Sequence, residues 1–437
     1  MSARHAALEV LTLCRKQEGW SNALLKEQIA RDHLDKRDAA LATRLCYGVL
    51  QNRSLLDFYA KQVLTGKLST LRPVVRDILH LGLYQILLMD KIPVSAAVNE
   101  SVDLAKHYCK KQPHAVPLIN AVLRKASDKT DWKQPDDLAT RYSHPENLLA
   151  LLRSYVGEER LEPMLIANNG APDTVIQVNV LKTDAESLKA RLSEEGVTAA
   201  AHPWLPDCLI LSGTGSIEKL PSFREGLYYV QDAAAKLSVD CAKIPAGDYL
   251  VTDCCAAPGG KSFAAAMALG GQGKIVSSDV YEHKVELIGK SAERLGMENL
   301  HPRRFDATEF DPALENRVDF AIVDVPCSGY GIIRKKPDIR LKDPDTMKEL
   351  PQLQLQILEN QSRYVRKGGV LLYSTCTLVR RENEGVVEKF LKKHPDFCME
   401  DLELPAVFGD RHSPELRLVP GEFETDGFFI CRLRRNS

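Results

Sequence analysis

The hydrophobic pattern divides the chain into a helical front part and a back part of alternating strands and helices. Up to about Ser127, apolar residues recur at intervals of three and four, as at Leu41, Leu45 and Val49. This is the spacing of one face of an α-helix, and few segments alternate apolar and polar residues as half-buried strands do. The pattern predicts an all-α domain over residues 1–130.

Local signals in the front part agree with this division. The apolar run of residues 78–89 contains His80 and Gln85 and is shorter than the roughly 18 residues of a membrane span, so it predicts a buried helix. Pro93 ends it, because the residue before a proline avoids the α conformation. The polar stretch Ser127–Asp137 predicts a linker.

Further along the chain, strand-like runs appear. TVIQVNVL and CLILSG flank the helix-like AESLKARLSEEG, which predicts a small α+β module over residues 140–235. From Tyr249 onward, continuous apolar runs such as YLVTDCCA and DFAIVDVP alternate with helical segments. The helix expected after DFAIVDVP covers residues 345–365. Strands of this kind are buried on both faces, so residues 236–437 are expected to form an α/β domain with a parallel, doubly wound sheet.

Composition narrows the class of protein. The chain is 44% hydrophobic and 27% charged, without an apolar leader or a membrane-length run, so we expect a soluble, cytoplasmic protein without a membrane partner. Its 11 cysteines lack paired CxxC spacings, which argues against a disulfide framework and against a zinc ribbon, and we expect no metal. The net charge is −1, but the first 140 residues hold 21 Lys and Arg against 15 Asp and Glu, which permits an anionic partner.

The segment DCCAAPGGKS, residues 253–262, joins a predicted strand to a predicted helix and ends like a phosphate-binding loop. The pattern GxxxxGK[ST] requires glycine where this chain has Cys255, and Pro258 has no backbone N–H to donate. The dinucleotide pattern GxGxxG is also absent. Nucleotide hydrolysis is therefore disfavoured, although a turn at the carboxyl end of a parallel strand still suits another ligand.

Three aspartates end the successive predicted strands that follow this turn, namely Asp279, Asp306 and Asp324. A single aspartate at a strand end more often caps the next helix. Three around one glycine turn suit a ligand with ribose hydroxyls and an ammonium group. The sequence therefore predicts S-adenosyl-L-methionine as the cofactor.

Two cysteines lie at the same predicted edge: Cys327 shortly after Asp324, and Cys376 at the end of GGVLLYSTC. One free cysteine is usually buried and inert, but a pair beside a cofactor turn indicates reactive thiols. Carbon 5 of a pyrimidine is too weak a nucleophile to take a methyl group directly, whereas thiolate addition at carbon 6 activates it. One thiol would add and the other would assist release; the residue types alone leave the two roles open.

Together, the motifs DCCAAPGGKS, DVPCSGYG, RKKPDIR, YSTCT and Glu382-Asn383-Glu384 resemble the RNA (cytosine-5) methyltransferase family. The front part, including SARHAALEVL and INAVLRK, resembles the NusB-like helical domain. The combination is similar to bacterial 16S ribosomal RNA (cytosine-5) methyltransferases of the RsmB/Sun type. This resemblance covers nearly the whole chain and implies a Rossmann-like methyltransferase domain behind a NusB-like RNA-binding domain.

The resemblance also implies residue roles. Cys376 would be the nucleophile, Cys327 the release-assisting thiol and main alternative nucleophile, and Lys261 a donor to the base or to the thiolate. Asp324 would bind the methionine ammonium or the base edge. Cofactor binding is expected from Cys255, Ala256, Ala257, Pro258, Gly259, Gly260, Lys261, Asp279 (ribose), Lys284, Asp306 (adenine side) and Asp324.

The expected substrate is a single-stranded or flipped-out cytosine in 16S ribosomal RNA, because a stacked base cannot be attacked from its ring face. We expect a monomer. Candidate phosphate contacts are Arg72, Arg76, Lys110, Lys111, Arg124, Lys125, Arg334, Lys335 and Lys336. The sequence departs from the family pattern at four positions, Gln177, Lys284, Leu341 and Asn147.

Three other functions remain open: a non-catalytic RNA-binding or antitermination-type factor, a cytosine-5 methyltransferase acting on another RNA, and a DNA methyltransferase. The intact Cys376 and Asp324 disfavour a pure binding protein, which has no need of a thiol beside a cofactor turn. The lack of a large DNA-recognition segment between the motifs disfavours DNA as substrate.

Overall fold

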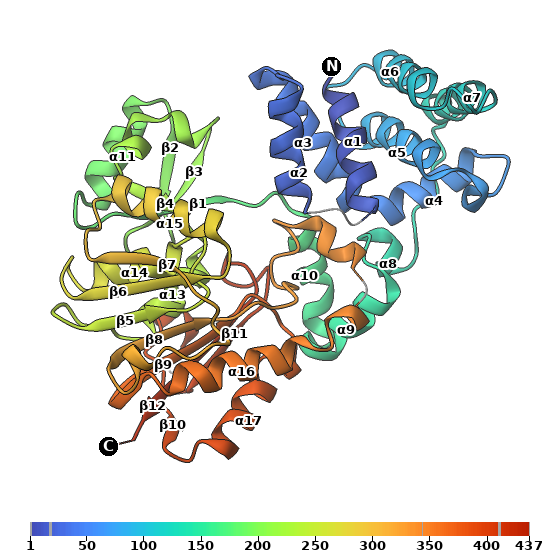
Figure 1. Ribbon diagram of the computed structural model, residues 1–437. Helices are drawn as coiled ribbons and strands as arrows, with labels where there is room; N and C mark the ends of the chain where they lie inside the picture. The colour runs from blue at the N-terminus through green and yellow to red at the C-terminus, as the bar shows by residue number, and fades with distance from the viewer. Residues whose placement is uncertain (1, 17–19, 343, 410–411, 437) are drawn as a thin grey trace. The chain divides into compact units, whose positions relative to one another are not determined.

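The computed structural model describes residues 2–16, 20–342, 344–409 and 412–436. The chain forms two compact units (Figure 1). The first, called the helical unit here, contains residues 1–170 together with residues 333–343. The second, called the sheet unit, contains residues 171–332 and 344–437. The chain therefore crosses between the units three times.

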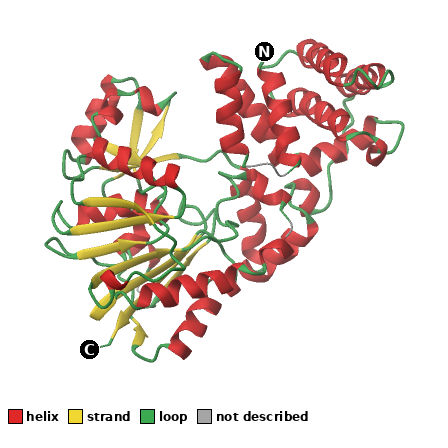
Figure 2. Ribbon diagram, in the orientation of Figure 1, coloured by secondary structure: helices red, strands yellow, loops and turns green. Residues whose placement is uncertain are grey.

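The helical unit consists of helices joined by loops, as Figure 2 shows. Its α-helices are α1 (Ala3–Arg15), α2 (Ser21–Arg31), α3 (Lys36–Gln51), α4 (Arg53–Val63), α5 (Pro73–Leu88), α6 (Val94–Tyr108), α7 (Ala115–Asp128), α8 (Leu138–Arg141), α9 (Glu146–Val156) and α10 (Glu158–Asn169). The all-α prediction for the front part is confirmed.

Helix α5 runs through the core of this unit, as the apolar run at residues 78–89 predicts. Its polar side chains are buried because each has a partner. His80 makes a 2.7 Å hydrogen bond to Asp57, and the Gln85 side chain donates to the Leu81 carbonyl at 2.7 Å. Among the described residues, no helix is both long enough and apolar enough to cross a membrane.

The sheet unit begins with an antiparallel four-stranded sheet in the order β2-β3-β1-β4. Its strands are β1 (Thr174–Val178), β2 (Thr198–Ala201), β3 (Cys208–Ser212) and β4 (Tyr228–Val230). Helix α11 (Ala185–Glu194) packs on it through Leu188 and Leu192, and α12 (Pro221–Arg224) precedes β4. This is the α+β module that the sequence predicts.

The larger sheet has the order β10-β12-β9-β8-β5-β6-β7, and β11 also pairs with β12. The five strands from β9 to β7 are parallel, whereas β10, β11 and β12 pair antiparallel. The strands are β5 (Leu250–Asp253), β6 (Lys274–Asp279), β7 (Leu300–Arg304), β8 (Val318–Asp324), β9 (Val365–Thr375), β10 (Phe397–Met399), β11 (Glu415–Leu418) and β12 (Phe428–Arg435).

Both faces of this sheet are covered, so its strands are apolar on both sides. In β9, Leu371 and Tyr373 pack with α16 (Leu350–Ser362) and α17 (Glu384–Lys393). Leu372, between them, points to the opposite face, which is covered by α13 (Ala233–Asp240), α14 (Gly260–Ala268) and α15 (Glu282–Leu295). The doubly wound α/β prediction is confirmed, and the antiparallel edge is an addition to it.

Two expectations about this unit need correction. The helix expected over residues 345–365 is shorter, because α16 begins at Leu350 with a proline in its first turn and the chain is already in β9 at Val365. Asp306 does not end its strand but follows the last residue of β7, Arg304, by two positions.

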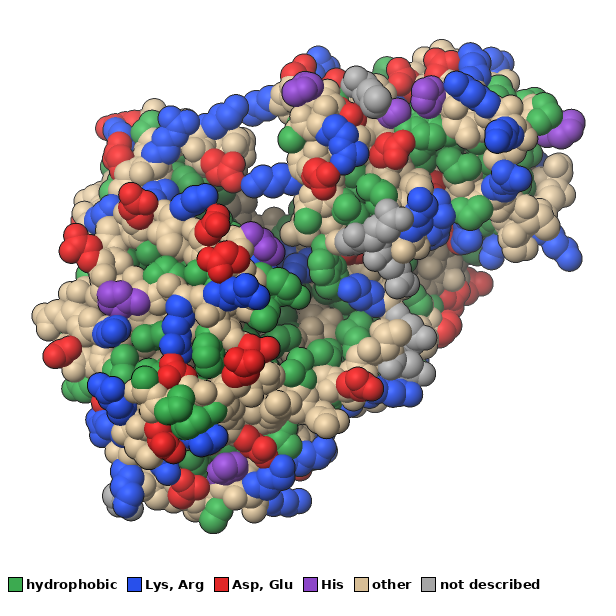
Figure 3. All heavy atoms as spheres, in the orientation of Figure 1, with side chains coloured by type: hydrophobic (Ala, Val, Ile, Leu, Met, Phe, Trp, Pro, Cys, Tyr) green, Lys and Arg blue, Asp and Glu red, His purple; other side chains and the backbone are tan. Residues whose placement is uncertain are grey.

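Acidic and basic side chains are interspersed over the face shown in Figure 3.

Candidate active site

The site residues follow the carboxyl ends of the parallel strands, where ligands bind in open α/β sheets. The strand order changes direction at β5, since β6 and β7 lie on one side of it and β8 and β9 on the other. The turn after β5, Asp279, Asp324 and Cys376 all end or follow strands at this one edge. Strand pairing thus collects residues that are far apart in sequence.

The glycine turn brings the backbone close to helix α14. Gly259 has φ +109°, and a Cβ there would lie 2.3 Å from the Phe263 ring, so only glycine fits. The turn is held to the neighbouring strand by the Ala256 N–H, which donates to the Ser278 carbonyl at 2.9 Å. Helix α14 begins directly at Gly260, and the unpaired N–H groups of a helix's first turn attract a carboxylate or phosphate.

Two of the predicted acidic residues have local partners. Asp279 is 6% exposed at the end of β6; its Oδ1 accepts from the Tyr281 N–H at 3.2 Å and lies 3.5 Å from Lys284 Nζ. The Asp306 carboxylate accepts from the backbone and hydroxyl of Thr308 at 2.9 and 2.7 Å. Both carboxylates are therefore fixed by the segment that follows them.

The structure brings together the two cysteines that the sequence singles out. Cys327 Sγ and Cys376 Sγ lie 3.1 Å apart, and both side chains are only partly buried. The Gly331 N–H donates to the Cys376 carbonyl at 3.0 Å, which ties the two loops together. The hydrogen bond to Cys376, together with burial, raises the pKa of Cys327 well above its usual value.

Lys261 and Asp324 form an ion pair beside these thiols. Lys261 Nζ lies 2.7 Å from Asp324 Oδ2, and the Ser374 hydroxyl donates to Asp324 Oδ1 at 2.8 Å. Burial alone would lower the pKa of Lys261, but the Asp324 carboxylate outweighs it, and the net pKa is raised. Negative charge on Cys376 also favours the protonated lysine. The Phe428 ring, 5.1 Å from the ammonium, covers it.

Glu382 and Asn383 brace the two cysteine loops, a role that the sequence pattern alone does not reveal. Glu382 accepts from the Ser328 N–H at 2.9 Å, directly after Cys327. The Asn383 side chain accepts from the Thr375 hydroxyl at 2.6 Å and donates to the Thr377 carbonyl at 3.0 Å, so it holds both residues that flank Cys376.

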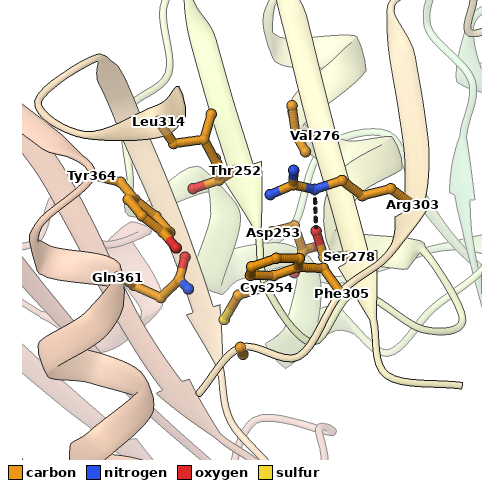
Figure 4. Close-up of a pocket in the computed structure, with 11 residues that line it drawn as sticks. Thr252, Asp253, Cys254, Val276, Ser278, Arg303, Phe305, Leu314, Gln361 and Tyr364 are labelled. Carbon is orange, nitrogen blue, oxygen red and sulfur yellow. Dashed lines mark hydrogen bonds between the residues drawn. The ribbon is translucent and has the colours of Figure 1, made fainter. Parts of the chain in front are cut away.

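A buried carboxyl lies behind the turn. Asp253, at the end of β5, is fully buried and accepts from the Ser262 hydroxyl at 2.7 Å. Burial raises its pKa to about 7. It borders a cavity of about 10 Å³ (Figure 4), room for roughly one water molecule, into which Gln361 and Tyr364 point from the end of α16 and the residues after it.

The positions that depart from the family pattern have structural roles. Gln177 is fully buried and its side chain donates to the Gln231 carbonyl at 3.1 Å. Leu341 packs against the core of the helical unit. Asn147 is exposed and its side chain accepts from the Leu148 N–H at 2.9 Å. The side chain of Lys284, the fourth such position, is 41% exposed, and Leu341 is only partly buried; only the fully buried Gln177 is closed to direct contact with RNA.

Sequence families cover most of the chain. Residues 1–128 match the NusB family, residues 144–218 the ferredoxin-like domain of RsmF/B-like methyltransferases, and residues 243–434 the 16S rRNA methyltransferase RsmB/F family. A Bacillus subtilis protein, "Probable ribosomal RNA small subunit methyltransferase B", is 36% identical over 99% of this chain and 99% of its own length. The chain belongs to the RsmB/F family of 16S rRNA methyltransferases.

Solved structures agree with this family fold. "Crystal Structure of PH0851" superposes on all of the chain and 99% of its own, with a TM-score of 0.82 and 24% identity. A "Methyltransferase Homolog Protein from Pyrococcus Horikoshii" matches 65% of this chain and 93% of its own at 28% identity and a TM-score of 0.55. The expectations of a NusB-like domain and a methyltransferase domain are confirmed.

Methyltransferases of this family depend on S-adenosyl-L-methionine, and the residues present fit that molecule. A close backbone approach at Gly259 and the open N–H groups at the start of α14 suit its carboxylate. The carboxylates of Asp279 and Asp306 suit ribose and adenine donors, and Asp324 suits the ammonium group. The described residues contain no cluster of three or more His, Cys, Asp or Glu side chains that could hold a metal ion.

Proposed function

We propose that the protein methylates carbon 5 of a cytosine in 16S ribosomal RNA through a covalent bond between Cys376 and carbon 6 of the base. The observation that carries this proposal is the pair of partly exposed thiols 3.1 Å apart, at the carboxyl ends of the parallel strands, where the turn after β5 also lies. S-adenosyl-L-methionine would supply an electrophilic methyl group, bound by the turn after β5 and by Asp279, Asp306 and Asp324.

Cys376 is the nucleophile in this proposal. Its thiolate bonds to carbon 6 and the ring electrons move toward carbon 5, which becomes able to accept a methyl group. The Lys261 ammonium interacts electrostatically with Cys376. Its positive charge therefore stabilises the negative charge, first on sulfur and then on the ring. Asp324 and Ser374 hold the ammonium in place.

Cys327 assists the second half of the reaction. Its raised pKa favours the thiol form of Cys327, and its sulfur lies 3.1 Å from that of the nucleophile. After methyl transfer the proton on carbon 5 leaves to a base, the carbon 5–carbon 6 double bond re-forms, and Cys376 departs. A thiol next to the departing sulfur stabilises its negative charge.

The target base must leave its stack, because attack at carbon 6 comes from the ring face. We therefore propose a single-stranded or flipped-out cytosine as the substrate. We also propose that the active form is a monomer.

The test is methylation of unmodified 16S ribosomal RNA with radiolabelled S-adenosyl-L-methionine, followed by nucleoside analysis. Label in 5-methylcytidine supports the proposal, and label in any other nucleoside refutes it. Cys376→Ala should abolish methylation, whereas Cys327→Ala should accumulate a protein–RNA adduct that survives denaturation. Cys398→Ala, at an exposed thiol on β10, is the control and should behave as the wild type. An adduct formed by Cys376→Ala would reverse the two roles.

A further inference from the structure

A short segment between β8 and β9 belongs to the helical unit instead of the sheet unit. Residues 333–343 pack there, with the 3₁₀ turn η4 (Pro337–Leu341) at their centre and Ile339 only 1% exposed. Asp338 fixes one side of the turn. Its carboxylate accepts from the Ser21 N–H at 3.1 Å and from the Ser21 hydroxyl at 2.9 Å, at the start of α2. It thus supplies the N-terminal cap that Trp20 does not provide.

Arg340 fixes the other side. Its guanidinium is 1% exposed and donates to the carbonyls of Gln51 (2.8 Å), Tyr142 (3.2 Å) and Asn168 (2.7 Å). These carbonyls lie at the ends of α3, α8 and α10, where backbone acceptors lack partners within their own helix. One side chain therefore joins three helix ends, and the segment has a defined position on this unit.

Beside these two anchors, an aromatic ring and two cations form one surface, made of Trp20, Lys336 and Lys342. Trp20 is 38% exposed. The ammonium groups of Lys342 and Lys336 lie 3.3 and 5.2 Å from the centre of its ring. No carboxylate of the described residues forms an ion pair with either lysine. Burial lowers the pKa of Lys342; the nearby Asp338 carboxylate partly offsets this, and the Lys336 charge lowers the pKa further. An anion bound here would relieve the repulsion between the two ammonium groups.

We infer that Trp20, Lys336 and Lys342 form a binding site for a single-stranded segment of the substrate RNA, in which the indole stacks on a base and the lysines contact phosphates. This inference rests on the proposed function. An exposed aromatic ring beside cations is what single-stranded RNA recognition requires, since every base has a face that can stack. A lysine above an exposed indole is held only weakly, so it can turn to a phosphate.

The covalent chain supports a role in the same reaction. Lys336 follows Cys327 by nine residues. Nine residues span at most about 30 Å when fully extended. The segment that carries Lys336 and Lys342 is therefore joined by a short stretch of chain to the loop of Cys327. Because the residues of the binding site come from two distant parts of the sequence, neither part shows the site by itself.

The test measures binding of unmodified 16S ribosomal RNA to the full-length protein across a range of salt concentrations. Lys336→Ala combined with Lys342→Ala should reduce the slope of log affinity against log salt by about 1.4, from two lost phosphate contacts on a single strand. Trp20→Ala should weaken binding about tenfold with the slope unchanged, and Trp20→Phe should retain most of the affinity. The matched control is Lys106→Ala with Lys189→Ala, since both lysines pair with a carboxylate on their own helix.

Tryptophan fluorescence distinguishes the loss of a Trp20 contact from misfolding, because a misfolded variant would not bind RNA. RNA should quench the wild type, and the Trp20→Phe variant should bind RNA with that part of the quenching lost. If the wild type binds and methylates RNA while the variants match it in affinity, slope and quenching, the inference is wrong and the proposed function stands. If the wild type neither binds nor methylates RNA, the proposed function itself fails.

Discussion

Asp253 offers a sharp test of the electrostatics behind the cofactor turn. Its side chain is fully buried, and burial raises its pKa from 3.8 to about 7. The Ser262 hydroxyl, which donates to it, only partly offsets the loss of water. Replacing Asp253 with asparagine keeps the shape and the acceptor oxygen but removes the ionisable group.

The pKa difference sets the expected size of the effect. A shift of about 3 units corresponds to about 4 kcal/mol at 1.36 kcal/mol per unit. The unfolded chain loses this proton near pH 4, whereas the folded protein keeps it until about pH 7. The protonated carboxyl therefore makes its full contribution to the free energy of unfolding below pH 4. This contribution is lost as the pH rises from 4 to 7, because the folded protein must hold a proton that the unfolded chain releases. Asp253→Asn should be more stable than the wild type by about 4 kcal/mol at pH 8 and by about 2 kcal/mol at pH 5.

Scanning calorimetry at the two pH values measures this difference. For a unit of about 250 residues, each kcal/mol moves the melting temperature by about 2–4 °C, so the variant should melt about 8–16 °C higher at pH 8 and about half as much at pH 5. Asp248→Asn, at an exposed carboxyl just before β5, controls for the lost charge. A melting-temperature change that is the same at pH 5 and pH 8 would refute a raised pKa at Asp253.

Three further predictions concern other parts of the molecule. Arg340→Met should destabilise the helical unit by about 3–6 kcal/mol in urea unfolding, because three buried carbonyls lose their donor; an effect below about 1 kcal/mol would contradict the capping role. Asn383→Ala should slow methylation roughly 100-fold with cofactor affinity unchanged, since the residues flanking Cys376 lose their brace; equal loss of cofactor binding in equilibrium dialysis would contradict this. Oxidised glutathione should link Cys327 to Cys376, releasing two reduced glutathione molecules, and lower the intact mass by about 2 Da; dithiothreitol should restore methylation, and Cys327→Ala should not form the link.

Much of the candidate site could be predicted because parallel strands end at one edge. Asp324 and Ser374 are register partners on β8 and β9, so the cysteines that follow them had to lie close together, although 49 residues separate them. The continuous hydrophobic runs indicate a parallel sheet, and this places the ends of both strands at the same edge. The 3.1 Å contact between the thiols follows from that topology more than from any property of the cysteines themselves.

Contacts that depend on loop conformation could not be predicted in the same way. Glu382 and Asn383 stand out as a motif, but nothing in their spacing shows that one holds the Cys327 loop and the other the residues around Cys376. The antiparallel strands β10, β11 and β12 are similarly hidden, because β10 and β11 are short and pair with a strand that comes later in the chain. Their pairing partners are set by tertiary structure, which local periodicity does not contain.

Residues 333–343 show why local pattern has a limit in this chain. In the sequence, Asp338 and Arg340 belong to the motif RKKPDIR, but nothing in that motif indicates that they are buried, since charged residues are rarely buried without partners. Their partners, Ser21 and the carbonyls at three helix ends, come from the first 170 residues. Burial of Arg340 without those carbonyls would cost several kcal/mol. The helical unit is therefore complete only after β8 has been synthesised, and a buried arginine from the middle of the methyltransferase sequence determines how its helices end.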